Sequence, residues 1–386
     1  MDMNQPEDTL PPGLARTDNA SVPVWDLGVR LFHWSLVVSV GICAYTGFLG
    51  PKNWLGIHLA SGAAIAALIV WRLVWGQMGT KYARFRSFPL SISAAVRHLR
   101  DAAMGRAPAD LGHNPAGAVM VYALLGVLVL VLLSGLVALG GALKQGPLAF
   151  ATTFAVGNWF REQHELLAIG LLALVAFHIL GDVFESWRTN ENLTWSMLTG
   201  RKRGSVSLDQ TAVEAYPWLA AWTMAGIALL IIPAGVRLSS FPALGVPTRP
   251  IDPVYAQQCG SCHFAYPPSL MTAPVWTAVM DGLADHFRKT VVLDTATAEQ
   301  IRGWLVTNSS EHWDTRAANR FRRMDPAEPL RITASPAWVH YHDDLPNAVF
   351  ASKAVGSKLA CGACHRDAAT GRFDPQEIAI PDGARP

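Results

Sequence analysis

Residues 116–140 read AGAVMVYALLGVLVLVLLSGLVALG and contain no charged side chain. A bilayer is crossed by about 20 mainly apolar residues, and a soluble core helix of this length would need a polar stripe. This stretch therefore predicts a transmembrane helix. Four further stretches are similarly long and apolar, so the sequence predicts five spans, approximately at 31–50, 54–74, 116–140, 164–184 and 217–236.

The composition of the whole chain agrees with a membrane protein. Of its 386 residues, 51% are hydrophobic and 16% are charged, against about 25% charged in soluble domains. This composition excludes intrinsic disorder and a wholly water-soluble globule. The net charge of +2 is too small for a nucleic-acid-binding protein, and no basic run with interleaved aromatic residues occurs.

Lysine and arginine in the short loops predict the direction of the spans, because basic loops stay in the cytoplasm. The loops after the second and fourth spans are basic and hold Lys81, Arg84, Arg86, Arg97, Arg100, Arg106, Arg188, Arg201, Lys202 and Arg203. The opposite connectors hold only Lys52, Lys144 and Arg161. We therefore expect a cytoplasmic N-terminus and an exported chain after Val236. Residues 1–22 lack the apolar region of a signal peptide and are expected to be a cytoplasmic leader.

Two copies of the string C-x-x-C-H lie in the exported part, at 259–263 and 361–365. This string is the attachment signature of a c-type haem, in which two thiols bond to the porphyrin and the histidine binds the iron. A thioredoxin-like pair or half of a zinc site would also contain C-x-x-C, but no other cysteine of this region could complete a four-sulfur site. The strings predict covalent attachment through Cys259, Cys262, Cys361 and Cys364, with His263 and His365 as proximal ligands.

Each c haem needs a sixth ligand unless it is an open, reactive site. The candidates are the other histidines and methionines of the exported part, and position alone does not choose among them: His286, His312, His340, His342, Met271, Met280 and Met324. A second histidine would hold the iron at low potential, whereas methionine would raise the potential. Helical fragments are expected over 276–287 and 296–307. The apolar periodicity is too weak for an ordinary core, so a large cofactor is expected to supply one.

Four histidines fall inside the predicted spans, where ionisable side chains are rare and usually functional. His33 and His178 lie near the cytoplasmic ends of their spans, and His58 and His164 lie near the exported ends. Fourteen residues separate His164 from His178, which is about 21 Å and nearly four helical turns. The depths predict two pairs, His33 with His178 and His58 with His164, each able to bind one b haem. A bis-histidine zinc or copper site would lack ligands and would not explain the matched depths.

Short segments within residues 22–205 carry a family resemblance: 24–26 (VWD), 30–34 (RLFHW), His58, 72–76 (RLVWG), 112–115 (GHNP), 164–165 (HE) and 178–181 (HILG). In these segments the chain resembles the bacterial cytochrome b561 family, which includes the cytochrome b subunits of nickel–iron hydrogenase and formate dehydrogenase. The resemblance implies that the four span histidines bind two b haems. It also implies quinone chemistry.

The exported part carries a second resemblance, over residues 250–375, in the segments 262–268 (CHFAYPP), Trp276, 283–287 (LADHF), 331–333 (RIT) and 342–346 (HDDLP). These segments are similar to the dihaem cytochrome c family. The resemblance implies that His286 and His342 are the distal ligands. The sequence departs from the family at 288–290 (RKT), where a glycine and an acidic residue are usual. His340, two residues from His342, leaves that ligand assignment open.

The sequence thus predicts an all-α membrane protein of the bacterial inner membrane, with two b haems and two c haems. The expected parts are a leader (1–22), a four-helix di-haem bundle (23–205), a fifth transmembrane helix with a linker (206–249) and a helical, loop-rich periplasmic dihaem cytochrome c domain (250–386).

Four haems in series predict electron transfer between the quinone pool and a periplasmic redox protein, with quinol as the expected donor. The reverse direction uses the same parts, and assembly into an oligomer is compatible with the sequence. If the chain is catalytic, its expected reaction is that of a quinol:cytochrome c-type oxidoreductase. One rival is an enzyme acting on a small molecule such as superoxide at an open haem, but eight histidine ligands are available for eight coordination places. A second rival is the membrane anchor subunit of a dehydrogenase or hydrogenase complex.

A quinol site is expected at the cytoplasmic end, where residues 112–115 enter the third span at the depth of His33 and His178. Asn114 can hydrogen-bond a quinone oxygen, and His113 is expected to titrate near neutral pH and to relay a proton. Related formate dehydrogenase subunits place their quinone beside the cytoplasmic-side haem, which favours this end by analogy. Alternatively, Asn114 caps the third helix before Pro115 at its first position, and His113 faces water.

Overall fold

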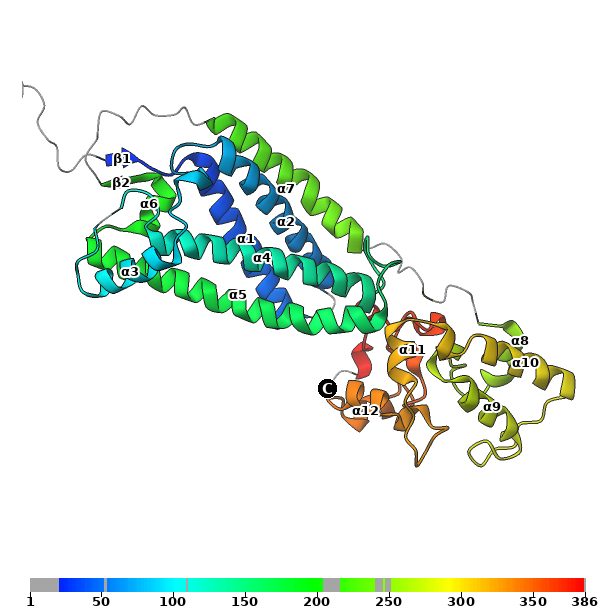
Figure 1. Ribbon diagram of the computed structural model, residues 1–386. Helices are drawn as coiled ribbons and strands as arrows, with labels where there is room; N and C mark the ends of the chain where they lie inside the picture. The colour runs from blue at the N-terminus through cyan, green and yellow to red at the C-terminus, as the bar shows by residue number, and fades with distance from the viewer. Residues whose placement is uncertain are drawn as a thin grey trace, which may run out of the picture. The chain divides into compact units, whose positions relative to one another are not determined.

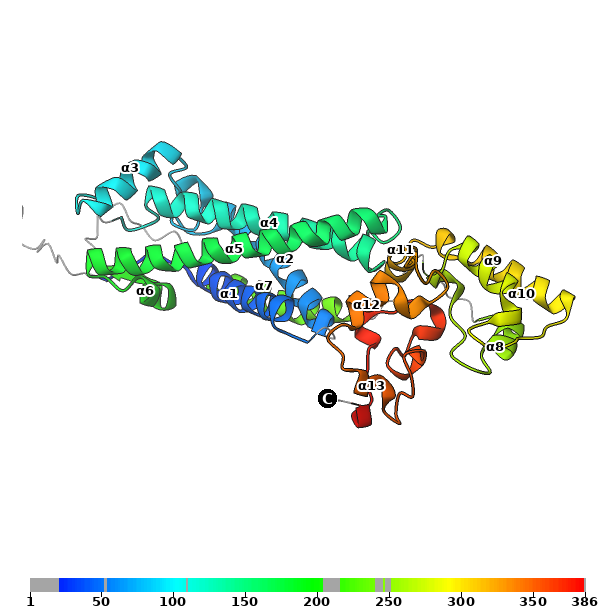
Figure 2. The same cartoon turned by 90° about the horizontal axis from the view of Figure 1, so that it is seen from below.

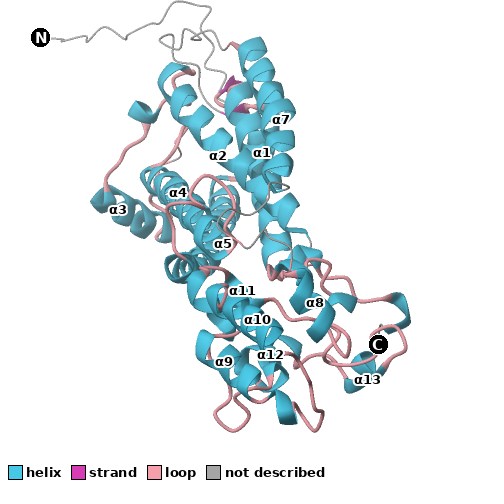
Figure 3. Ribbon diagram, turned by 90° about the vertical axis from the view of Figure 1, so that its right-hand side faces the viewer, coloured by secondary structure: helices cyan, strands magenta, loops and turns pink. Residues whose placement is uncertain are grey.

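The computed structural model describes residues 21–51, 54–108, 110–203, 216–239, 246 and 251–384. Its long helices are α1 (Leu27–Phe48), α2 (Leu55–Met78), α4 (Pro115–Ala142), α5 (Phe154–Thr189) and α7 (Pro217–Ser239), all labelled in Figure 1. Helices dominate the described chain, and its one small sheet has two strands (Figure 3). Most of the predicted leader and most of the predicted linker lie outside the described residues.

The chain forms two compact units, and the long helices contribute to both. The first unit comprises residues 1–41, 61–129 and 168–232, and the second comprises 42–60, 130–167 and 233–386. Each unit therefore contains parts of the long helices. The second unit also contains the C-terminal part of the chain, described over residues 251–384.

Among the described residues, four helices are long and apolar enough to span a membrane: α1, α2, α4 and α5. They correspond to the first four predicted spans, so the chain is a multi-pass membrane protein with an all-α fold. The fourth helix begins ten residues before its predicted start, at Phe154. The fifth predicted span falls in α7, whose apolar run among the described residues is Pro217–Leu230. α7 packs beside α2, where Trp71 Nε1 donates to Thr223 Oγ1 at 2.8 Å.

In the first unit, short elements join the helices at one end of the bundle. These are β1 (Ser21–Pro23), η2 (Phe85–Ser87), α3 (Ile92–Ala103), α6 (Leu193–Thr199) and β2 (Arg201–Arg203). The strands pair antiparallel with Val22 opposite Lys202. Asp26, just before α1, accepts hydrogen bonds from Trp75 Nε1 at 3.2 Å and from Thr80 Oγ1 at 3.0 Å. The chain entering α1 and the two basic loops therefore meet at the same end of this unit.

Helix α3 lies in the basic loop between α2 and α4. Ser91 caps it by accepting a hydrogen bond from Ala94 N at 3.2 Å. Ile92, Val96 and Leu99 are exposed along one face. This spacing of exposed apolar residues, next to arginines, is typical of a helix that lies in the interface of a membrane.

The C-terminal part of the second unit, residues 251–384, consists of short helices joined by loops (Figure 2). They are α8 (Pro253–Cys259), α9 (Ala273–Asp281), α10 (Thr295–Thr307), α11 (Arg316–Phe321), α12 (Pro336–His342) and α13 (Asn347–Ala351), with the 3-10 turns η3 (Pro268–Leu270), η4 (Leu283–Asp285), η5 (Ser310–His312), η6 (Ile332–Ala334), η7 (Cys361–Ala363), η8 (Ala368–Thr370), η9 (Pro375–Glu377) and η10 (Asp382–Ala384). The helix predicted over 296–307 is α10. The one predicted over 276–287 is split into α9 and η4 at Gly282.

The expectation that this part lacks an ordinary core is wrong. Eleven residues form a buried apolar cluster: Tyr255, Ala265, Tyr266, Leu270, Met271, Trp276, Met280, Ile301, Leu305, Ala317 and Ile332. Sequence periodicity did not reveal this core because each short element contributes only one or a few of its residues.

Candidate metal centres

The first histidine pair lies in the first unit. His33 on α1 and His178 on α5 have ring centroids 6.4 Å apart, with ring planes tilted by 60°. The buried Nδ1 of His33 has no hydrogen-bond partner. The two residues that matched depths predicted as a pair thus face each other.

The second pair, His58 on α2 and His164 on α5, lies in the second unit with ring centroids 6.1 Å apart. Each ring is oriented through Nδ1 by a neighbouring helix. Thr46 Oγ1, 3.0 Å from His58 Nδ1, donates its own proton to Ile42 O and so accepts from the imidazole. His164 Nδ1 donates to Val131 O at 2.9 Å. In both residues Nε2 is the nitrogen left to bind a metal, an arrangement usual for metal-binding histidines.

The third pair joins the first cysteine string to the turn after η4. His263 and His286 have ring centroids 6.2 Å apart and planes inclined by only 29°. His263 Nδ1 donates to Phe264 O at 2.8 Å. His286 and Lys289 exchange two backbone hydrogen bonds around a two-residue turn. Both central residues of that turn, Phe287 and Arg288, have positive φ (52° and 68°), as a type I′ turn requires.

The fourth pair joins the end of α12 to the second cysteine string. His342 and His365 have ring centroids 6.2 Å apart. His342 Nδ1 donates to Trp338 O at 2.8 Å, and the Trp338 ring stacks on the imidazole at 4.5 Å. His340, the competing candidate, is exposed and contacts the ring of Tyr341 instead.

The separations within the four pairs fit a haem iron between two imidazoles. Two iron–nitrogen bonds of about 2 Å, together with about 1.1 Å from each nitrogen to its ring centre, give a centroid separation of about 6.2 Å. The observed values run from 6.1 to 6.4 Å. Within the described residues, no three His, Cys, Asp or Glu side chains cluster as a zinc or copper site would need. The residues present therefore fit four bis-histidine haems.

Burial favours the neutral form of three C-terminal histidines, His286, His342 and His365, and neutral imidazole is the form that binds a metal. Desolvation and then His342 lower the pKa of His365 to about 4. Desolvation also lowers the pKa of His342, and desolvation followed by His263 lowers that of His286. The methionines offered as alternative ligands lie elsewhere: Met271 and Met280 belong to the apolar core, and Met324 packs against it.

The four haem-string cysteines stand beside their histidines. Cys259 ends α8, whose first turn is capped by Asp252 through Tyr255 N at 2.9 Å, and Cys361 begins the 3-10 turn η7. Burial raises the pKa of the Cys259 and Cys361 thiols to about 11. Such thiols are protonated at neutral pH and are not thiolate ligands as they stand.

A glycine is required beside the second pair. A Cβ at Gly135 on α4 would lie 2.9 Å from His164 Cε1, closer than real contacts allow, whereas a Cβ at Gly47 on α1 would lie 3.5 Å from His58 Cε1. We expect Gly135→Ala to displace His164 and to lower the content of the corresponding b haem. Gly47→Ala is the matched control and should keep both b haems. Haem content per polypeptide is the measurement, and equal content in both variants would contradict the expected clash.

Asn114 and His113, the two residues expected to bind quinol, have different surroundings in the structure. Asn114 Oδ1 accepts a hydrogen bond from Gly117 N at 2.7 Å, and Pro115 begins α4, so Asn114 caps the helix as the alternative interpretation stated. His113 does not face water, because its ring contacts Phe88 at 4.3 Å and Trp25 at 4.9 Å. The expectation that His113 titrates near neutral pH is wrong. Burial, with smaller effects of Arg72, Lys202 and His178, lowers its pKa to about 4.

Arg72 is a residue whose importance sequence reasoning missed. It lies on α2, fourteen residues after His58 and therefore on nearly the same face, and only 4% of its surface is exposed. Its guanidinium stacks on Phe85 at 4.4 Å, and its Nη1 has no hydrogen-bond partner among the described residues. The sequence feature that could have identified Arg72 is its position as a lone arginine inside an apolar span, where charged residues are usually functional.

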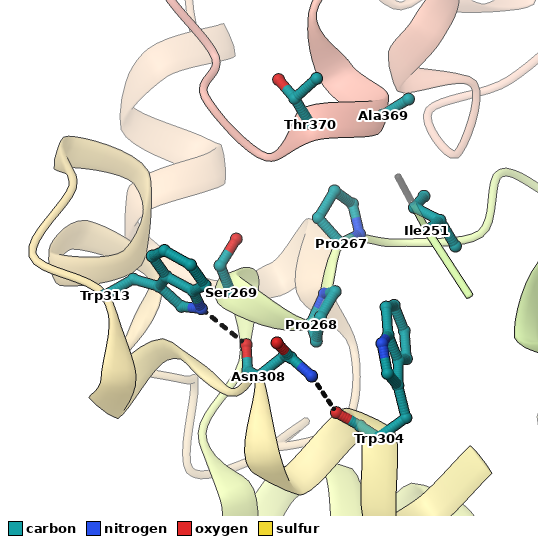
Figure 4. Close-up of a pocket in the computed structure, with 9 residues that line it drawn as sticks. All are labelled: Ile251, Pro267, Pro268, Ser269, Trp304, Asn308, Trp313, Ala369 and Thr370. Carbon is teal, nitrogen blue, oxygen red and sulfur yellow. Dashed lines mark hydrogen bonds between the residues drawn. The ribbon is translucent and has the colours of Figure 1, made fainter. Parts of the chain in front are cut away.

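Figure 4 shows a pocket of the C-terminal part that is lined by none of the paired histidines. It is lined by Ile251, Pro267, Pro268, Ser269, Trp304, Asn308, Trp313, Ala369 and Thr370. Trp313 Nε1 donates to Asn308 O at 3.1 Å, and Asn308 Nδ2 donates to Trp304 O at 2.8 Å. The pocket separates the chain that follows His263 from the chain that follows His365, and contains no candidate ligand of either pair.

Two parts of the chain match protein-family models. Residues 24–200 match prokaryotic cytochrome b561, and residues 255–373 match dihaem cytochrome c. No curated protein matches the chain.

Solved structures of dihaem cytochromes c are similar to about a third of this chain. DHC purified from Rhodobacter sphaeroides is 32% identical, with a TM-score of 0.25, over 32% of this chain and 97% of that chain. A second structure, the dihaem cytochrome c from the same organism, is 34% identical, with a TM-score of 0.27, over 31% and 94%. The dihaem cytochrome c from Shewanella baltica is 30% identical, with a TM-score of 0.29, over 36% and 98%.

Proposed function

This chain belongs to the prokaryotic cytochrome b561 family over residues 24–200 and to the dihaem cytochrome c family over residues 255–373, so it is a membrane electron-transfer protein with two b haems and two c haems. We propose that it oxidises membrane quinol and passes the electrons to a periplasmic redox protein. Each quinol would release two electrons and two protons. The haems supply one-electron carriers between donor and acceptor.

The observation that carries this proposal is the set of four histidine pairs at one common separation. In the proposal, His33 with His178 and His58 with His164 hold the b haems. His263 with His286 and His365 with His342 hold the c haems, which Cys259, Cys262, Cys361 and Cys364 attach. With every iron bound by two histidines, the protein would offer no open coordination place to a small molecule. This supports electron transfer over the superoxide-oxidising alternative.

The proposed orientation places the end with the basic loops in the cytoplasm of a bacterial inner-membrane protein. It is supported by the arrangement of the first unit, in which Lys202 Nζ donates to Asp110 O at 2.9 Å and Arg188 Nη1 donates to Ala107 O at 2.6 Å. Both basic loops therefore share one end, as the positive-inside rule requires. A reporter active only in the periplasm should work when fused after residue 384 and fail when fused at Gly79. Activity at Gly79 would reverse the orientation.

The proposed quinol site lies at the end that holds His33 and His178. Two buried nitrogens there, Nη1 of Arg72 and Nδ1 of His113, have no hydrogen-bond partner within the described part of the chain. A quinone oxygen accepts hydrogen bonds from such groups. Phe88 links them, since its ring centre lies 4.3 Å from the His113 ring and 5.9 Å from the Arg72 guanidinium. Asn114 keeps its Nδ2 group as a further donor while its Oδ1 caps α4.

The test of this function is anaerobic stopped-flow mixing of the purified tetrahaem protein with a soluble quinol. We expect reduction of the b haems first and of the c haems afterwards, because the path runs from the membrane pair outward. Absorbance of b-type and c-type haems is followed separately. If quinol reduces none of the haems that dithionite reduces, the proposal is overturned. If pre-reduced c haems reduce quinone faster than quinol reduces the haems, the direction of electron transfer is the reverse of the one proposed.

Two variants and one control locate the quinol site. Arg72→Met and His113→Phe should each slow quinol-driven reduction about tenfold or more, the effect of losing roughly one buried hydrogen bond to substrate. Dithionite-driven reduction should stay unchanged. Asn114→Ala should lower stability by about 1 kcal/mol through loss of the helix cap, and it should also slow quinol-driven reduction because Nδ2 is a further proposed donor. Parental rates in both Arg72→Met and His113→Phe would place the quinol site elsewhere.

A further inference from the structure

Asp314 of the exported part is bonded to the connection between α4 and α5. One oxygen, Oδ2, accepts from Lys144 Nζ at 2.5 Å and from Phe154 N at 2.8 Å. The other oxygen, Oδ1, accepts from Asn319 Nδ2 at 3.1 Å. Residues 130–167 and 233–386 belong to the same compact unit, so these contacts lie inside the second unit.

The Asp314 carboxylate is the counter-charge of a buried ammonium group, that of Lys144. The side chain of Lys144 is only 7% exposed, and among the residues that the structure describes its Nζ has one other acceptor, Thr152 O at 2.9 Å. Burial acts to raise the pKa of Asp314, but hydrogen bonds from Lys144 and Phe154 lower it overall. Asp314 is therefore ionised at neutral pH. Removing it would leave a buried ammonium group without a counter-charge, which is strongly unfavourable.

A second contact ties the same two segments together. Arg320 Nη2 donates to Asn158 Oδ1 at 2.9 Å, and the Arg320 guanidinium lies 5.8 Å from the ring centre of Phe154. Asp314 lies two residues before α11, and Arg320 lies in the last turn of α11. This short segment therefore presents a negative and a positive group to the start of α5, and two separate polar contacts restrict its position more than one contact would.

The contact is made at the start of the helix that carries the second histidine pair. Phe154 is the first residue of α5, and its N–H is one of the groups that a helix leaves unbonded. His164 follows ten residues later, about 15 Å along the same axis. Asp314 thus bonds directly to the element that carries a proposed b-haem ligand.

We propose that Asp314 is a positioning residue for electron transfer from the b haems to the c haems: through Lys144 and the N-terminus of α5 it clamps the dihaem part onto the bundle and fixes the distance that electrons cross. This proposal rests on the proposed electron path. The clamp itself does not, and the two can be tested apart.

The clamp is tested by hydrogen exchange on the full-length, haem-loaded protein. In Asp314→Ala and Lys144→Met we expect amides of residues 144–158 to exchange about tenfold faster or more, as expected when a contact worth about 1.4 kcal/mol is lost. Asp314→Asn keeps an acceptor for Phe154 N and should give an intermediate effect. The matched control is Asp281→Ala, which breaks an ion pair of 2.7 Å with Arg302 far from this connection. Unchanged exchange in Asp314→Ala would overturn the clamp.

The positioning role is tested on the same variants by stopped-flow reduction. Reduction of the b haems should keep its rate, and the following reduction of the c haems should slow about tenfold in Asp314→Ala, with haem content and midpoint potentials unchanged. Faster exchange with an unchanged c-haem rate would overturn the positioning role while leaving the proposed function intact. If the c haems of the parental protein are not reduced through the b haems, the proposed function fails, and the exchange result still decides the clamp.

Discussion

Replacing His178 with alanine should remove one b haem and leave the other b haem and both c haems in place. His178 faces His33 at 6.4 Å, so its loss leaves an iron with one protein ligand and a cavity inside the bundle. A non-covalent haem held on one side in this way should dissociate. The b-haem absorbance should fall by about half, measured as haem per polypeptide by the pyridine haemochrome method. Quinol-driven reduction of the c haems should cease in the same variant.

The other three span histidines provide the controls for this prediction. His33→Ala should lose the same spectral component as His178→Ala. His58→Ala and His164→Ala should both lose the other component, because those rings face each other at 6.1 Å. His164 and His178 lie on one helix. If their two variants lose different b-haem components, the effect comes from the lost ligand and not from general damage to α5. Identical losses from His33→Ala and His58→Ala would show that the pairing is wrong.

The arrangement of the intramembrane histidines could be predicted because it depends on helix geometry alone. Depth in a span and a spacing of fourteen residues are properties of the sequence, and both pairs follow from them. The helix cap at Asn114 was foreseen as one of two alternatives for the same reason, since capping is local. The structure assigns Oδ1 of Asn114 to that cap and leaves the amide group for other partners.

The features that the sequence did not reveal depend on contacts between distant segments. Lys144 and Asp314 are 170 residues apart, and neither side chain is unusual by itself. The burial of His113 depends on Trp25 and Phe88, which reach it from two other parts of the chain. Its low pKa could not be anticipated from a spacing. Arg72 is the exception, because an arginine within an apolar span is visible in the sequence and was considered only as part of a family motif.

The distal ligand of the second c haem was left open between His340 and His342, and the structure distinguishes them by helix phase. Both lie on α12, but residues two apart point in nearly opposite directions. His342 faces His365 and is held by Trp338, through both its carbonyl and its ring. His340 therefore cannot share that position without rotation of the helix. This difference makes the two histidines a matched pair for mutation.

We expect His342→Ala to convert the c haem held by His365 from a low-spin, six-coordinate centre to a high-spin, five-coordinate one. The haem itself should stay attached, because Cys361 and Cys364 bond it covalently. Electron paramagnetic resonance and the visible spectrum report the spin state, and added imidazole should restore the low-spin form by filling the open place. His342→Met should instead stay six-coordinate at a higher midpoint potential, since methionine raises the potential of a haem relative to histidine. His340→Ala, at an exposed position on the same helix, should leave the spectrum and the potential unchanged. A high-spin centre in His340→Ala with a parental spectrum in His342→Ala would transfer the ligand role to His340 and would require α12 to be rotated from the orientation described.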